Sequence, residues 1–191
     1  MSIKVITPPA LEPITAIEAK LHTRVDTETE DSLIDIWIKS GRELAEKFQN
    51  RAYITQVLEY TLDHWPASPF NVPRPPLASI VADGFKYFGT DNTEYTFAAD
   101  NYFVDTDSEP GRISLAYSRN YPSTILRPIN GIKIRFTAGY GAATADVPQN
   151  VRDAILLYVT YRYEHRAEEM DVESAPTQFY QLLWPDRVVA I

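Results

Sequence analysis

Cysteine is absent from the 191 residues of this chain. Disulfide bonds, thiolate nucleophiles and cysteine metal sites are therefore excluded. The three histidines are far apart and none has the spacing of a metal-binding helix motif, so we expect no metal site: they are His22, His64 and His165. No apolar run approaches the roughly 18 residues of a membrane span, so we expect no membrane partner. Met1–Lys4 shows no apolar signal segment, which favours assembly in the cytoplasm.

Motifs for catalysis are also missing. There is no Gly-x-Ser-x-Gly elbow for a serine nucleophile. Gly139-Tyr140-Gly141 lacks the third glycine and the lysine of a phosphate-binding loop, and is typical of a strand-to-helix turn. Four carboxylates cluster near one turn without calcium-loop spacing, so we interpret them as turn formers: Asp100, Asp105, Asp107 and Glu109. The sequence therefore predicts no catalytic residues, no metal ligands and no cofactor.

The balance of charge is acidic, with 18 Lys and Arg against 26 Asp and Glu, a formal net charge of −8. Such a chain repels a polyanion at long range, which argues against a nucleic-acid binder but permits a protein past which DNA slides. Twelve tyrosines, eight phenylalanines and three tryptophans are many for this length. They need a large core or an interface in which to be buried.

The N-terminal part is predicted to be helical after an extended segment, residues 1–13, that contains three prolines. Thr15 and Glu18 have capping-box spacing, so a short helix should span Thr15–Leu21. An acidic stretch then leads into apolar residues at helical spacing, which predicts a core helix that reaches Gln49 with Thr29 as its N-cap.

The middle of the chain is predicted to be a β module. From Tyr53 to Asp63 apolar and polar residues alternate, as in a strand. Five prolines in residues 66–76 disfavour regular pairing and predict an extended edge segment. Turn residues then separate short strand candidates at 79–82, 85–88, 94–97, 102–104, 112–117 and 132–137.

A second long helix is expected from about Pro148 to Glu168, followed by an acidic loop at 169–176 and one or two helical turns at 177–184 that end before Pro185. The fold class is therefore α+β: a small α-helical core of two long helices plus short helices, with an antiparallel β module inserted between the long helices. We divide the chain into residues 1–52, the N-terminal helical part; 53–141, the β module; 142–170, the second long helix; and 171–191, a C-terminal arm.

The C-terminal segment has two interpretations. It folds back over the core, or it forms an arm whose apolar side chains anchor in a partner. The residues concerned are Phe179, Tyr180, Leu182, Leu183 and Trp184.

Several segments, in this order, resemble the phage head–tail connector (adaptor) family of long-tailed phages and related gene-transfer particles. They are Ile14–Leu21 with His22–Asp26; the acidic helix Asp31–Phe48 with Asn50–Gln56; Pro73–Leu77; Glu109–Ile113; and Phe136–Gly141 followed by Val147-Pro148 and the helix Val151–Arg166. Together they cover most of the chain.

The resemblance implies a structural, non-enzymatic subunit with no cofactor. It implies a ring of about twelve copies in the virion neck, between portal and tail, which extends the DNA channel. The implied partners are the chain itself, the portal protein and a tail-completion or stopper protein, while DNA passes through the lumen without specific binding. It also implies that the C-terminal segment reaches the portal, which makes its apolar residues a hypothetical portal anchor.

Two alternatives remain open from the residues. One is another neck or tail-completion ring protein, which has a similar mixture of helices and strands. The other is a carbohydrate-binding β module, whose tyrosines and tryptophans would stack on sugars and would need to be exposed and coplanar.

Overall fold

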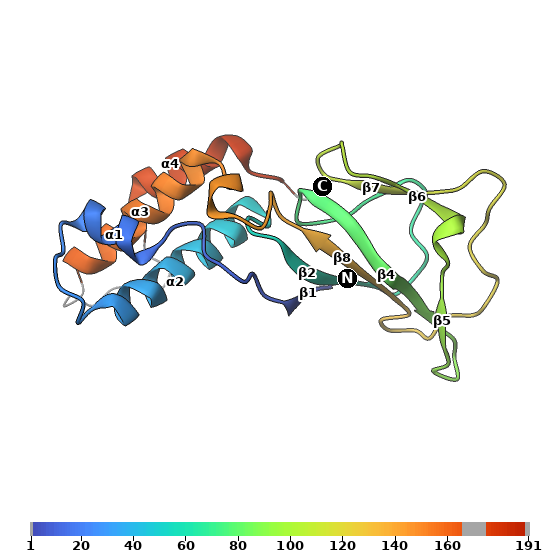
Figure 1. Ribbon diagram of the computed structural model, residues 1–191. Coiled ribbons are helices and arrows are strands. Elements are labelled where there is room, and N and C mark those ends of the chain that lie inside the picture. Colours follow the sequence, from blue (N-terminus) through green and yellow to red (C-terminus); the bar gives the residue numbers. More distant parts are fainter. Residues whose placement is uncertain (1, 166–174, 190–191) are drawn as a thin grey trace. The chain divides into compact units, whose positions relative to one another are not determined.

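The computed structural model describes residues 2–165 and 175–189, and it forms two compact units (Figure 1). The sheet unit consists of residues 1–9 and 55–140, and the helical unit consists of residues 10–54 and 141–191. The α+β class with strands between the two long helices is confirmed. No helix among the described residues combines the length and apolar character needed to cross a membrane.

The helical unit contains α1 (Ala16–Thr23), α2 (Asp31–Gln49), α3 (Gln149–Glu164) and α4 (Thr177–Leu183), with short 3-10 turns at Thr144–Asp146 and Trp184–Asp186. The predicted capping box is present: Thr15 Oγ1 accepts a hydrogen bond from Glu18 N at 3.2 Å, and Thr15 N donates to Glu18 Oε2 at 2.8 Å. The predicted N-cap of α2 is wrong. Glu30 holds that position, and the Thr29 hydroxyl instead donates to Thr27.

The core of the helical unit lies between α2 and α3. Buried side chains of α2, such as Ile34 and Ile38, pack with the buried face of α3. Gly41 allows this close approach, because a Cβ at that position would lie 2.9 Å from Cδ1 of Tyr158. The helix α3 ends at Glu164 with His165 as its C-cap, and residues 166–168 of its predicted range lie outside the described residues.

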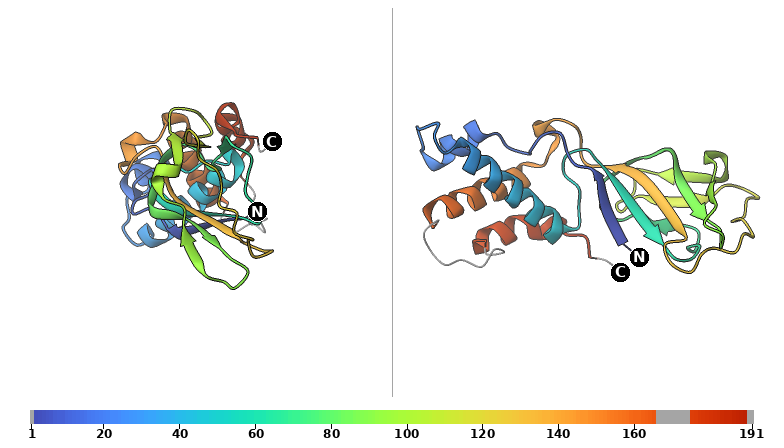
Figure 2. Two further views of the ribbon diagram at one scale, coloured as in Figure 1. Left: turned by 90° about the vertical axis from the view of Figure 1, so that its right-hand side faces the viewer. Right: turned by 90° about the horizontal axis from the view of Figure 1, so that it is seen from below.

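The sheet unit contains two antiparallel sheets. The larger has the strand order β1-β2-β8-β4-β5, built from β1 (Ser2–Thr7), β2 (Gln56–Leu62), β8 (Ile132–Ala138), β4 (Leu77–Phe88) and β5 (Glu94–Thr96). The smaller has the order β3-β7-β6, built from β3 (Phe70–Asn71), β7 (Arg112–Leu115) and β6 (Tyr102–Asp105), with a 3-10 turn at Ala99–Asn101. Figure 2 shows the blue β1 strand beside the teal β2 strand.

Three details of the predicted β module and N-terminal part differ in the structure. Residues 2–7 are a strand rather than unpaired chain, because the first proline, Pro8, comes after six residues that are free to pair with β2. Residues 1–9 therefore belong to the sheet unit. The proline-rich segment also pairs, at Phe70–Asn71 with β7.

The third difference concerns β4. The strand candidates 79–82 and 85–88 are one strand whose register with β8 shifts between Ile80 and Phe85. Gly84 lies in this irregular stretch, where a Cβ would lie 2.7 Å from the carbonyl oxygen of Arg135. A β-bulge therefore lies between the two segments that the sequence pattern predicts as separate strands.

Candidate interaction surfaces

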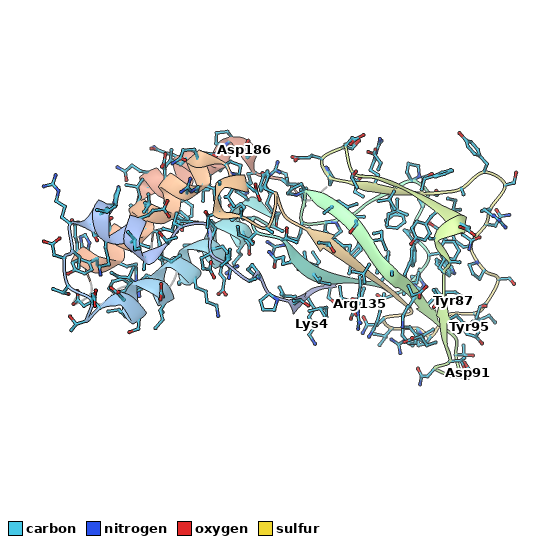
Figure 3. All side chains as sticks on the ribbon, viewed as in Figure 1. Lys4, Tyr87, Asp91, Tyr95, Arg135 and Asp186 are labelled. Carbon is cyan, nitrogen blue, oxygen red and sulfur yellow. The ribbon has the colours of Figure 1, made fainter. Side chains whose placement is uncertain are left out.

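The C-terminal segment is held on the end of α2 by hydrogen bonds to its backbone. The side-chain amide of Gln49 donates to the carbonyl of Leu183 at 2.5 Å, and Arg51 Nε donates to the carbonyl of Asp186 at 2.6 Å. Asn50 Nδ2 donates to the carbonyl of Val188 at 2.9 Å. Figure 3 labels Asp186 in this region. Residues 175–189 are therefore folded onto the helical unit rather than extended from it.

Two of the five predicted anchors belong to the core. Phe179 and Leu183 are both 0% exposed, and the Phe179 ring centroid lies 5.8 Å from that of Tyr158 on α3. Their spacing of four residues places both side chains on one face of α4. In this conformation the two side chains cover the core of the helical unit.

The other three predicted anchors lie at or near the surface. Trp184 is 64% exposed, while Tyr180 and Leu182 are half-buried. The Phe48 ring joins this group, at 5.0 Å from Tyr180 and 6.2 Å from Trp184. The guanidinium of Arg187 lies over the same Phe48 ring at 4.9 Å. We call these five residues the Trp184 surface, an aromatic patch of the composition common in protein interfaces.

An ion-pair network around the buried Arg42 is linked to Gln49 through Glu46 and Tyr53. Arg42 Nε lies 2.6 Å from Glu12 Oε2, and Arg42 Nη1 lies 2.8 Å from Glu46 Oε2. Glu46 also accepts a hydrogen bond from Tyr53 N at 2.9 Å, and Tyr53 Oη donates to Gln49. Burial lowers the pKa of Arg42, but the bond to Glu12 and the charge of Glu46 outweigh it, so this pKa is raised overall. The spacing of Arg42 and Glu46, four residues on a helix, was the available sequence signal.

A second apolar surface lies on α1. Ile17 and Leu21 are 72% and 76% exposed and are one helical turn apart. They border a hollow of about 450 Å³ whose remaining lining residues are Lys20, Arg24, Val25 and Asp26. Large apolar side chains at this spacing on a surface helix usually cover something in an assembly. We call this group the α1 surface.

One face of the larger sheet carries ion pairs. Glu59 on β2 accepts a hydrogen bond from Arg135 Nε on β8 at 2.7 Å, and Lys133 Nζ lies 3.6 Å from the same carboxylate. Lys86 on β4 pairs with Glu94 on β5. These cross-strand pairs make this face of the sheet polar.

In the turn that contains the clustered carboxylates, Asp105 holds the backbone and neighbouring side chains by hydrogen bonds. Its carboxylate accepts hydrogen bonds from the guanidinium of Arg112 and from Ser108 and Asp107. Together, with Arg112 contributing most, they hold the pKa of Asp105 well below its ordinary value. In the described part of the chain no group of three acidic, histidine or cysteine side chains is arranged to hold a metal ion.

Neither a protein-family model nor a curated protein matches this sequence. Solved structures do match. A chain of the neck of an empty gene transfer agent (GTA) particle, computed with C6 symmetry, has a TM-score of 0.81 at 21% identity. A chain of a native GTA virion has a TM-score of 0.79 at 21% identity, and one of the native neck computed with C12 symmetry has 0.74 at 20%. Each match covers 100% of this chain and 97% of the other. The chain shares the fold of these particle proteins.

Because the match spans both units, it concerns the whole fold and not one common substructure. At 20–21% identity the likeness extends to the path of the chain and does not transfer individual surface residues. The roles of the Trp184 and α1 surfaces must therefore be argued from their own chemistry.

Proposed function

We propose that this protein is a structural subunit of a ring in the neck of a phage or gene-transfer particle, a head–tail connector that extends the DNA channel. The observation that carries this proposal is the full-length fold likeness to GTA particle chains, two of them in necks computed with C6 and C12 symmetry. No catalytic group is needed for such work, which is done by shape and by many weak contacts that act together on ring closure.

The surfaces of the helical unit support the assembly role. The helical unit exposes two separate groups of large apolar side chains, the α1 surface and the Trp184 surface, and each is a candidate contact with a neighbouring protein. A head-to-tail ring needs two different patches on each subunit, and a ring that docks on another protein needs one more. We assign the Trp184 surface to the portal, because its aromatic rings and Arg187 have the composition of an interface centre.

Net charge supports passage of DNA without capture. The formal charge of −8 would become strongly repulsive when about twelve copies surround a channel. Phosphate groups would then slide past the ring, which fits a conduit better than a DNA-binding protein.

The test of portal docking uses Trp184→Ser. Removing residues 177–191 would be uninformative, because Phe179 and Leu183 would leave the core with them. Because Trp184 is 64% exposed, its replacement should leave the fold intact while weakening capture by the purified cognate portal at least about tenfold, as for an aromatic hot spot. The matched control is Tyr117→Ser in the sheet unit, where the ring is 91% exposed. Equal capture of wild type and Trp184→Ser would contradict the assignment.

The same experiment separates this proposal from another neck or tail-completion ring protein, which would bind tail tube rather than portal. The cluster of rings around Trp65 does not favour a carbohydrate-binding module. The Trp65 ring stacks on Tyr121 at 4.5 Å and packs near Phe97 at 5.7 Å, so these rings are covered by one another and offer no flat platform to a sugar.

A further inference from the structure

The strand β1 is an unprotected edge of the larger sheet. It pairs with β2 alone, and all six of its residues, Ser2–Thr7, are exposed. Soluble proteins usually protect an edge strand with a proline, several charges or a covering segment. Here Lys4 is the one charge of the strand, its register with β2 shifts between Val5 and Thr7, and the prolines begin only after its last residue, so Ser2–Val5 form a regular open edge. Its outer backbone groups are therefore available to a further strand.

The opposite edge of the same sheet is β5. Glu94–Thr96 pair with β4 alone, and all three residues are exposed. Tyr95 stacks on Tyr87 of β4, with ring centroids 5.1 Å apart, and Figure 3 shows the two side chains together at this edge. The sheet thus ends in two different edges that both lack a partner among the described strands.

The register places matching side chains on matching faces of these edges. Lys4 lies opposite Glu59, which lies opposite Arg135, so these three share the polar face. Lys86 on β4 lies opposite Lys133, which is two residues from Arg135 and so on the same polar face. Glu94 on β5 lies opposite Phe88, two residues from Lys86, and is on that face too. Ile3, Val5 and Tyr95 lie on the other face, the one that carries Leu58 and Ile134. Each edge therefore presents one charge on the polar face and exposed apolar side chains on the other.

We propose that β1 of one copy of the chain receives β5 of a second copy, so that the larger sheet continues from subunit to subunit. The occupant is a second copy because the two edges are complementary. Lys4 meets Glu94, whose carboxylate pairs with Lys86 in its own chain and gains a second cation, and Ile3 and Val5 meet the apolar ring of Tyr95. This inference rests on the proposed ring function and names the contact that closes the ring.

Strand direction is consistent with a ring. Four antiparallel steps separate β1 from β5, so the two strands run in the same direction within one sheet. When a second copy extends the sheet, its β5 therefore runs parallel to the β1 that it joins. The contact uses two different edges, and such a head-to-tail contact generates closed rings when the rotation between copies closes.

The test uses cysteine pairs, which are clean because the chain has no cysteine of its own. Tyr95→Cys is combined in turn with Ile3→Cys and with Val5→Cys, because a shift of two residues keeps the same face. Within one chain these positions are four strand spacings apart, about 19 Å, well beyond the roughly 7 Å between Cα atoms that a disulfide can span. Any disulfide between them must therefore join two chains.

The variants are oxidised after assembly on the cognate portal and separated on a denaturing, non-reducing gel. At least one of the two pairs should give a ladder of covalent multimers that disappears on reduction. The matched control is Tyr95→Cys with Ile129→Cys, an exposed position of the same unit outside both edges, which should give no ladder. Melting curves of the reduced variants verify the fold.

Two results would overturn strand addition. One is assembled rings without a ladder from either pair. The other is covalent dimers of the single variant Val5→Cys, without Tyr95→Cys, which would indicate that two β1 strands pair with each other. Light scattering of the wild-type chain mixed with portal distinguishes failure of strand addition from failure of the proposed ring function. If no ring forms, the ring function and strand addition are both rejected. A ring that gives no ladder rejects strand addition alone.

Discussion

Gln49 and Leu183, both fully buried, are joined by a 2.5 Å hydrogen bond from the Gln49 side-chain amide to the Leu183 carbonyl. The side-chain oxygen of the same amide, Gln49 Oε1, accepts a hydrogen bond from Tyr53 Oη at 2.7 Å. One side chain thus links the C-terminal segment to the chain that leaves α2. Trp184 follows directly after Leu183, so this bond is one of those that fix the segment that carries it.

We predict that Gln49→Ala destabilises the protein, because it leaves the buried Leu183 carbonyl without this donor and Tyr53 without this acceptor. Each buried polar group that loses its partner costs about 1–3 kcal/mol. The free energy of unfolding in urea measures the loss. The control is Gln181→Ala on α4, whose side chain is exposed. A loss no larger than that of the control would contradict the role of Gln49.

The Arg42 network gives a second prediction. Arg42→Met removes the buried cation and leaves Glu46, whose side chain is 11% exposed, facing an apolar group. Breaking a buried ion pair from one side costs about 3–5 kcal/mol, and denaturant unfolding should show a loss of that order. The comparison is Lys39→Met, on the exposed side of the same helix, with an expected change within about 0.5 kcal/mol. Equal losses would show that the network contributes no more than a surface charge.

Close packing at Gly111 gives a third prediction. A Cβ there would lie 2.5 Å from Cβ of Leu77, which belongs to β4 and cannot rotate away. Gly111→Ala should therefore lower the melting temperature, with a cost of about 1–3 kcal/mol for overpacking. Gly89→Ala is the matched control, because its nearest contact at 2.9 Å is the movable Asp91 carboxylate. Similar melting temperatures for the two variants would contradict this packing.

The turn around Asp105 gives a prediction about pH. Hydrogen bonds from Arg112, Ser108 and the backbone lower the pKa of this carboxyl in the folded protein. The stability it contributes is complete above the unfolded pKa, near 4, and is lost as the pH falls toward the lower folded pKa. Asp105→Asn should therefore melt below wild type at pH 7, and this gap should narrow as the pH falls below about 4. A gap independent of pH would show that the Asp105 charge is not responsible.

Much of the helical unit is predictable from sequence because its signals are local. Thr15 and Glu18 form the expected capping box, and apolar spacing identifies α2 and α3. The N-cap of α2 could not be assigned, because Thr29 and Glu30 are adjacent and Thr29 has a competing local partner in Thr27.

What the sequence does not reveal depends on partners distant in the chain. The strand β1 needs β2, more than fifty residues away, and six residues next to prolines carry little signal alone. The Arg42–Glu46 pair is visible in its four-residue spacing, but Glu12 and Tyr53 join it from other segments, which no spacing predicts. The burial of Phe179 and Leu183 was partly visible in their four-residue spacing, whereas the exposure of Trp184 was not.

The most direct measurement of the central claim is the mass of the purified chain, alone and mixed with the cognate portal, by light scattering. The proposal predicts a species of roughly 260 kDa, twelve copies of the 21.7 kDa chain, or a portal complex that gains this mass. A monomer that leaves the mass of the portal unchanged would contradict the assignment as a connector.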